Sequence, residues 1–94
     1  MNRSNITNLQ DIPNIGPAMA EDFRRLGISA PSELVGVDPY VLYDKLCRVT
    51  GQKHDPCVID TFIAAVRYME GASAKPWWAY TAERKKTLAA AKKK

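Results

Sequence analysis

The stretch IPNIGPAMA at residues 12–20 decides how this chain of 94 residues begins to fold. It predicts a tight apolar turn followed at once by a helix, because Gly16 admits backbone angles denied to other residues and Pro17 suits the first position of a helix. A helix that starts in this way leaves its first backbone N–H groups without partners, at the positive end of the helix dipole. The stretch therefore predicts a place where an anion such as phosphate is favoured.

The same residues resemble the helix-hairpin-helix (SAM-like) motif, which holds nucleic-acid backbones through main-chain amides. The usual order in that motif is hydrophobic, Pro, Gly, hydrophobic, Gly, and this chain departs from it at Asn14, which stands where the first glycine is common. Asn tolerates a left-handed backbone better than most residues, so we expect the hairpin to form. The resemblance implies that the amides of Gly16, Ala18 and Met19 face a phosphate. Asn14 would add a side-chain or main-chain contact.

Charge is unevenly distributed along the chain, whose formal net charge is +4. Residues 1–81 carry eight basic and nine acidic side chains, whereas residues 82–94 carry six basic side chains and one acidic. Basic tails commonly bind nucleic acid, although a solvated end is the more frequent use of such a composition. We predict DNA contacts in the hairpin, the helix after it and the tail: Asn14, Ile15, Gly16, Ala18, Met19, Arg24, Arg25, Arg84, Lys85 and Lys86.

Length and composition favour one small domain. A hydrophobic fraction of 46% is ordinary for a globular protein and argues against disorder of the whole chain. No apolar run approaches the roughly 20 residues of a membrane span, so we expect no membrane association. The polar start at residues 1–5 does not resemble a signal peptide, and two cysteines without such a signal predict free thiols in the cytoplasm.

Helical signals run along the whole chain, and no alternating β pattern interrupts them. We predict an all-α fold, a compact bundle of about five helices in a domain at residues 1–81, with a basic C-terminal helical extension at residues 82–94. The expected segments begin near residues 4, 17, 31, 39, 56 and 81, at capping residues and prolines, and Gly27 and Gly71 mark two of the ends. The last segment has only Leu88 as a large apolar residue, so we expect it to be frayed and exposed.

Residues 34–39, LVGVDP, repeat the form of residues 12–17. The second copy has Gly36 where the first has Asn14, and Asp38 where the first has Gly16. A carboxylate at a helix start caps the free amides itself and repels phosphate, so we expect the second copy to be structural. The alternative is coincidence, since short turns before proline-led helices look alike.

Trp77 and Trp78 admit two interpretations. Adjacent aromatic side chains stack on bases in proteins that bind single strands. More often such residues seal the open apolar end of a helical bundle, with each indole N–H near water or a carbonyl. We favour sealing, because no Arg or Lys alternates with these rings.

Cys47, His54 and Cys57 are the best metal-ligand set in the sequence. A structural zinc site needs four ligands in tetrahedral geometry. Only Asp55 is near enough in sequence to be the fourth, and it is better explained as the cap of the helix that follows Pro56. We therefore expect no metal and no cofactor, with His54 bonded to a carbonyl.

Catalysis has no evident carrier in this sequence. The chain has one histidine and no glycine-rich phosphate loop. We expect Asp38, Asp44 and Asp60 at cap or surface positions on different helices, and paired carboxylates for Mg²⁺ are not indicated. We therefore predict that the protein is not an enzyme.

Several segments besides the hairpin resemble one family. They are LGI at residues 26–28, LC at residues 46–47, HDPC at residues 54–57 and PWW at residues 76–78. Together they resemble the helix-hairpin-helix family of pathogenicity locus proteins, some members of which are named for mitomycin resistance. The resemblance covers about residues 5–86 and implies a small helical module of the DNA-binding type.

The hairpin and the tail together predict weak, sequence-nonspecific DNA binding through backbone amides, without catalysis and linked to DNA repair or damage resistance. Phosphate contacts position a protein without distinguishing bases, and no base-contacting helix is evident. The alternative is a protein-protein interaction module that uses the hairpin and the Trp-rich end. The basic tail favours DNA, and the near-neutral body favours a protein partner.

Overall fold

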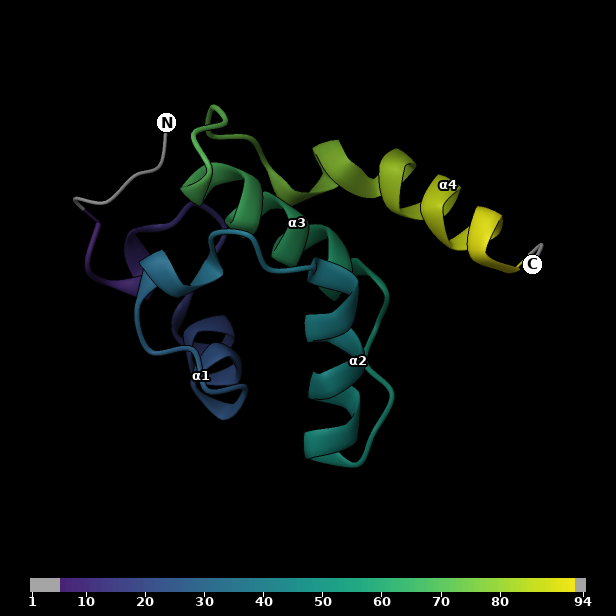
Figure 1. Cartoon of the computed structure of the whole chain (residues 1–94), viewed down its shortest axis with the longest axis horizontal. Helices are drawn as coiled ribbons and strands as arrows, with labels where there is room; N and C mark the ends of the chain where they lie inside the picture. Colours follow the sequence, from purple (N-terminus) through teal and green to yellow (C-terminus); the bar gives the residue numbers. More distant parts are fainter. Residues whose placement is uncertain (1–5, 93–94) are drawn as a thin grey trace.

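The computed structural model describes residues 6–92, which form an all-helical domain with no strand (Figure 1). This part of the chain forms four α-helices and three short 3₁₀ helices. In order they are η1 (Leu9–Asp11), α1 (Pro17–Arg25), η2 (Pro31–Leu34), α2 (Pro39–Thr50), α3 (Cys57–Met69), η3 (Trp77–Tyr80) and α4 (Thr81–Lys92). None of these helices is long and apolar enough to cross a membrane.

The all-α class is confirmed, but the expected number of helices is corrected. The first expected helix contributes only the 3₁₀ turn η1, and its proposed caps at Ser4 and Asn5 lie outside the described residues. The third is the 3₁₀ turn η2, held at its start by the Glu33 carboxylate, which accepts from the amides of Ser29 and Ala30 at 2.7 and 2.9 Å. Segments this short gain too few hydrogen bonds to propagate as α-helix.

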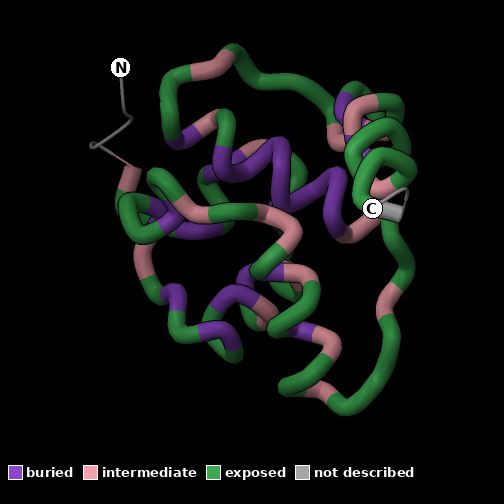
Figure 2. The backbone as a smooth tube through the Cα atoms, turned by 45° about the vertical axis from the view of Figure 1, so that its right-hand side comes forward, coloured by how far each residue is buried: buried purple, intermediate pink, exposed green. Residues whose placement is uncertain are grey.

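Helix α3 lies at the centre of the domain. Its residues are buried almost without interruption from Ile59 to Val66, and Figure 2 shows this run as the longest buried stretch of the tube. On one side the Phe62 ring contacts the Phe23 ring of α1, with centroids 5.2 Å apart. On the other side Ile59 packs with Tyr80 of η3 in a second, smaller apolar cluster. A helix covered on two sides in this way explains why its sequence is the most apolar segment of the chain.

Two turns of the same form lie on the α1 and α2 sides of the core. We name residues 12–17 the first turn and residues 34–39 the second turn. Asn14 and Gly36 occupy equivalent places, with φ angles of 73° and 80° in the left-handed region. In each turn the next amide donates to the carbonyl three positions earlier, at 3.1 Å. The repeat noticed in the sequence is therefore a repeat of backbone geometry, and coincidence of letters does not explain it.

Helix α4 is anchored to α3, which corrects the expectation of a frayed extension. Its residue Arg84 is only 9% exposed and its Nε donates at 2.9 Å to Asp60, which is fully buried. The Thr81 hydroxyl donates to the other oxygen of the same carboxylate at 2.7 Å, instead of capping the helix. Further along, Leu88 packs against the second apolar cluster. Asp60 is thus a buried partner in the core, and the surface position expected for it is wrong.

Candidate nucleic-acid interface

The first turn ends in a helix start whose amides are open. Gly16 is the N-cap of α1 and no side chain caps the helix there. Within residues 6–92 the amides of Gly16, Ala18 and Met19 have no hydrogen-bond acceptor, while the amide of Ala20 already donates to the Gly16 carbonyl at 3.0 Å. These amides lie at the positive end of the α1 dipole, which is an arrangement that suits an anion.

The conformation of Gly16 differs from the expectation. Its φ and ψ are −92° and −174°, which is extended backbone that any residue adopts. A Cβ atom added there would meet no atom within 4 Å beyond the chain neighbours. Neither backbone strain nor packing therefore requires glycine at this position. Glycine here has no side chain that could cap the amides of α1, so they stay open.

The second turn shows the contrasting case. Asp38 occupies the place of Gly16, and its carboxylate accepts from the amide of Tyr40 at 2.8 Å. The helix start of α2 is therefore filled by its own side chain, and its charge opposes an anion. The geometry agrees with the expectation that the second turn is structural.

Asn14 takes the left-handed conformation expected of it, but its side chain does not face the open amides. Its Nδ2 donates at 2.8 Å to the carbonyl of Lys75, which lies 61 positions later in the chain. Asn14 thus takes the left-handed conformation that the turn needs, and its side chain bonds the turn to the loop that leads into η3. This contact was missed from the sequence, because nothing local marks Lys75 as the partner.

Arg24 and Arg25, predicted as DNA contacts, lie at the end of α1 and are paired with acidic side chains one turn earlier. Their partners are Glu21 at 3.2 Å and Asp22 at 3.4 Å. Exposed pairs of this kind contribute at most about 1 kcal/mol, so a phosphate can replace either carboxylate at little cost. Both arginines therefore remain available for a phosphate contact, although each is paired with a carboxylate in this structure.

The three predicted residues of α4 divide into two groups. Lys85 and Lys86 are exposed, so their charges face solvent. Arg84 is held in the buried pair with Asp60, and this bond raises the pKa of its guanidinium further. Arg84 therefore cannot serve as a DNA contact without removing α4 from the body, and we exclude it from the interface.

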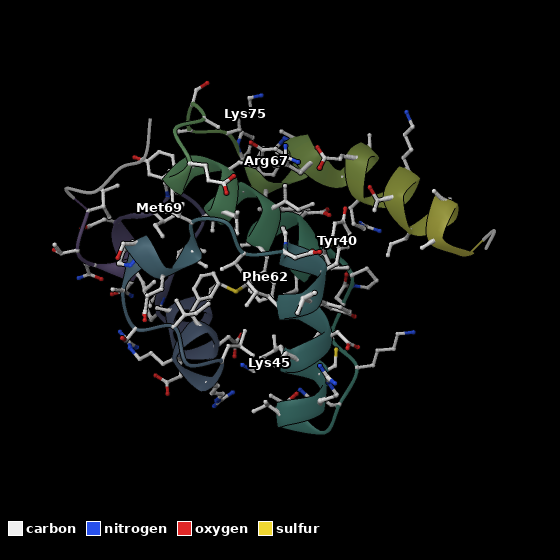
Figure 3. The ribbon with its side chains drawn as sticks, in the orientation of Figure 1. Tyr40, Lys45, Phe62, Arg67, Met69 and Lys75 are labelled. Atoms are coloured by element: carbon white, nitrogen blue, oxygen red, sulfur yellow. The ribbon has the colours of Figure 1, made fainter. Side chains whose placement is uncertain are left out.

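The Trp-rich segment also differs from the expectation that both rings seal the bundle. Tyr80 is the buried member of η3, whereas Trp78 is 63% exposed. The two indoles meet edge to face, with centroids 5.6 Å apart and planes at 86°. Arg67 and Lys75 lie near each other above α3 (Figure 3), each with its charged end within 6 Å of the Tyr80 ring centre. Two cationic side chains from outside the WWAY segment therefore lie against Tyr80.

Cys47, His54 and Cys57 do not converge on a common centre. The His54 ring pairs with the Thr50 hydroxyl at 2.8 Å, and its backbone carbonyl accepts from the Tyr43 hydroxyl. In residues 6–92 no group of three or more His, Cys, Asp or Glu side chains is placed to hold a metal ion. The expected bond from the His54 ring to a carbonyl is replaced by a bond to a hydroxyl.

Asp55 performs the capping role predicted for it. Its carboxylate accepts from the Cys57 amide at 2.8 Å, and this bond holds the carboxyl pKa below its ordinary value. The same carboxylate and partial burial raise the pKa of the Cys57 thiol. A raised pKa disfavours the thiolate, which is the nucleophilic form of this side chain.

A cleft of about 380 Å³ lies where α4 meets the body, lined largely by apolar atoms of Tyr40, Ile59 and Leu88. The Tyr40 hydroxyl is buried beside it and has no partner within the described residues. Tyr43, Asp44 and Lys53 also line the cleft, so polar and charged side chains border its apolar wall. We interpret the cleft as an incompletely filled seam between α4 and the second cluster.

These features define a class of protein: a small all-helical module with an open helix start at α1 and, within its described residues, no group of side chains placed to hold a metal ion. The chain belongs to the Cdd1 family, described as pathogenicity locus, whose family model matches residues 2–86. It is similar to the mitomycin resistance protein McrB of Streptomyces lavendulae, with 42% identity over 89 residues that cover 95% of this chain and 85% of the relative. No solved structure matches the chain.

Proposed function

We propose that this protein binds the sugar-phosphate backbone of DNA without sequence specificity, through the first turn acting as a helix-hairpin-helix hairpin. The contrast between the two turns carries the proposal. They share one backbone geometry, yet Asp38 fills one helix start while Gly16 leaves the other open. Neither the backbone angles nor the packing around residue 16 requires glycine. Close approach of a phosphate to the amides of α1 would explain why this position has no side chain.

The remaining charges support weak, nonspecific binding. Main-chain amides recognise phosphate oxygens and carry no information on the base. Lys85 and Lys86 add exposed positive charge that attracts any nucleic acid. The body is close to neutral, so the charged part of the attraction comes mainly from residues 82–94, and the hairpin supplies directed hydrogen-bond donors. No catalytic step is part of the proposal.

The comparison suggests where such binding is used. The Streptomyces relative is named a mitomycin resistance protein. We propose that this chain likewise acts in resistance to damage, and that it does so by holding DNA rather than by chemical conversion of the damaging agent. The open amides at the start of α1 offer backbone contacts for DNA, and this supports the proposal.

The test is Gly16→Asp, which copies the second turn into the first. The new carboxylate would cap the α1 amides as Asp38 caps those of α2, so folding should be retained, with stability changed by only a few tenths of a kcal/mol. Loss of charge-assisted hydrogen bonds should weaken binding to a random-sequence duplex by about tenfold to a hundredfold at low salt. Fluorescence anisotropy measures the affinity, and a melting curve measures the fold.

Gln52→Glu is the matched control. It changes the charge by the same amount at an exposed position just beyond α2, and it should change affinity much less. If Gly16→Asp binds DNA as tightly as Gln52→Glu does while remaining folded, the first turn is not the phosphate site.

A protein-protein interaction module is the second candidate. Trp78 favours it, because a large ring that is 63% exposed in so small a domain is a common anchor at protein interfaces. Absence of binding to any DNA at low salt, by the wild-type protein itself, would make this candidate the better one.

A further inference from the structure

We propose that the first turn and the Trp77–Trp78 pair form one binding surface that selects single-stranded over double-stranded DNA. The turn holds a phosphate and Trp78 stacks on an unpaired base of the same strand. This inference rests on the proposed function, since it needs the turn to hold phosphate, and it adds the class of nucleic acid that is held.

The Trp pair presents a ring that is ready to stack. Trp78 is 63% exposed, and its edge-to-face contact with Trp77 orients the two indoles at 86° to each other. The segment is anchored by Tyr80, which is buried against α3, so the ring sits on a fixed support. Stacking on a supported ring costs little conformational entropy, because the side chain is already ordered.

The bond between Asn14 and Lys75 brings this ring to the phosphate site. Lys75 lies three positions before Trp78, and its carbonyl is tied to the first turn at 2.8 Å. The loop into η3 is therefore held against the first turn, at a residue two positions before the helix start at Gly16. A strand that places a phosphate at the turn has its neighbouring bases close to this loop, and the Lys75 ammonium adds positive charge there.

The chemistry of the surface discriminates between strands. Bases within a duplex are stacked on their neighbours and covered, so a protruding ring on a flat support gains nothing from them. Bases of a single strand expose their faces to an aromatic side chain and stack irrespective of sequence. Amides at the turn attract both forms, whereas Trp78 attracts only the single strand.

Asn14 makes a side-chain contact in this arrangement that a glycine could not make. The second turn shows that Gly36 forms the same left-handed turn, so the backbone alone does not require asparagine. The side chain of Asn14 adds the bond to Lys75. Asn14 is therefore a positioning residue, which acts by holding the Trp loop against the turn.

The experiment compares the affinities for a short oligo(dT) strand and for a random duplex of equal length. The wild-type chain should favour the single strand at least about fivefold, the lower end of what one stacked base contributes. Trp78→Leu should lower this ratio to near one, and Trp78→Phe, which keeps a ring, should retain part of it. The chain has two tryptophans, both at this surface, so oligo(dT) should quench their emission more strongly than the duplex does.

Asn14→Gly tests the positioning role. It should retain the melting temperature within a few degrees and lower the single-strand preference, as Trp78→Leu does but to a smaller extent. Gly36→Asn is the matched control in the second turn and should leave the ratio unchanged.

The outcomes separate the two proposals. Binding to duplex with no single-strand preference, or a preference that Trp78→Leu does not alter, overturns the inference and leaves the phosphate site of the first turn standing. Binding to neither form at low salt overturns both. A single-strand preference that depends on Trp78 but not on Gly16→Asp overturns the phosphate site and, with it, the inference that the turn and the Trp pair act as one surface.

Discussion

Replacing Arg84 with methionine should remove a large part of the stability of this domain. Asp60 is fully buried and would lose its partners at 2.9 and 3.4 Å, keeping only the Thr81 hydroxyl at 2.7 Å. Breaking one side of a buried ion pair costs about 3 to 5 kcal/mol, because the remaining charge is left without compensation. A chain of 94 residues has roughly 5 to 14 kcal/mol in total. Arg84→Met should therefore be near the limit of folding at 37 °C.

Urea denaturation followed by circular dichroism measures this loss, and two variants calibrate it. Glu83→Gln breaks the neighbouring Arg67–Glu83 pair, which is 2.6 Å long but nearly half exposed on both sides, and should cost less than about 1 kcal/mol. Asp60→Leu combined with Arg84→Met removes both charges and should lie much closer to the wild-type stability than Arg84→Met alone. If Arg84→Met costs no more than Glu83→Gln, then α4 is not anchored through this pair.

Three further predictions concern the tail, the acid limb and metal content. Lys85→Gln with Lys86→Gln should lower the slope of log affinity against log salt by about 1.4 to 1.8 if both contact phosphate, and an unchanged slope would show that they face solvent only. The two backbone amides hold the pKa of Glu33 below its ordinary value of 4.5, so its contribution to stability is present above that pH and is lost as the pH falls through the lowered value. Urea midpoints measured from pH 6 to pH 3 should therefore fall less steeply for Glu33→Gln. Elemental analysis of protein purified without chelator should show no stoichiometric zinc, and one zinc per chain that is lost with His54→Ala would overturn this.

The helix starts could be predicted from the sequence because their signals are local. Pro17 and Pro39 occupy the first position of α1 and α2, and Asp38 and Asp55 cap amides two residues away. Each of these interactions is complete within three residues, so composition and spacing contain all the information that is needed. The same holds for the left-handed backbone at Asn14.

The contacts that place α4 and the Trp loop could not be predicted in this way. Asp60 resembles an ordinary acidic residue in the first turn of a helix, and Arg84 resembles one more positive charge in a basic tail. Only the packing of α4 across α3 makes them partners over 24 positions. The exposure of Trp78 is likewise a result of Tyr80 taking the buried place. Contacts between distant parts of the chain decide which of two similar residues is buried and which is exposed, and the periodicity of the sequence does not indicate this.

The open start of α1 has a consequence for the protein inside a cell. The proposed site, made of main-chain amides, would accept any phosphate group, so RNA, free nucleotides and inorganic phosphate would compete there with DNA. Millimolar phosphate buffers should then mask weak DNA binding and also stabilise the fold, since a ligand that binds only the folded state raises its stability. Occupancy by DNA would depend on local concentration, which is raised whenever a second contact keeps the protein close to the strand.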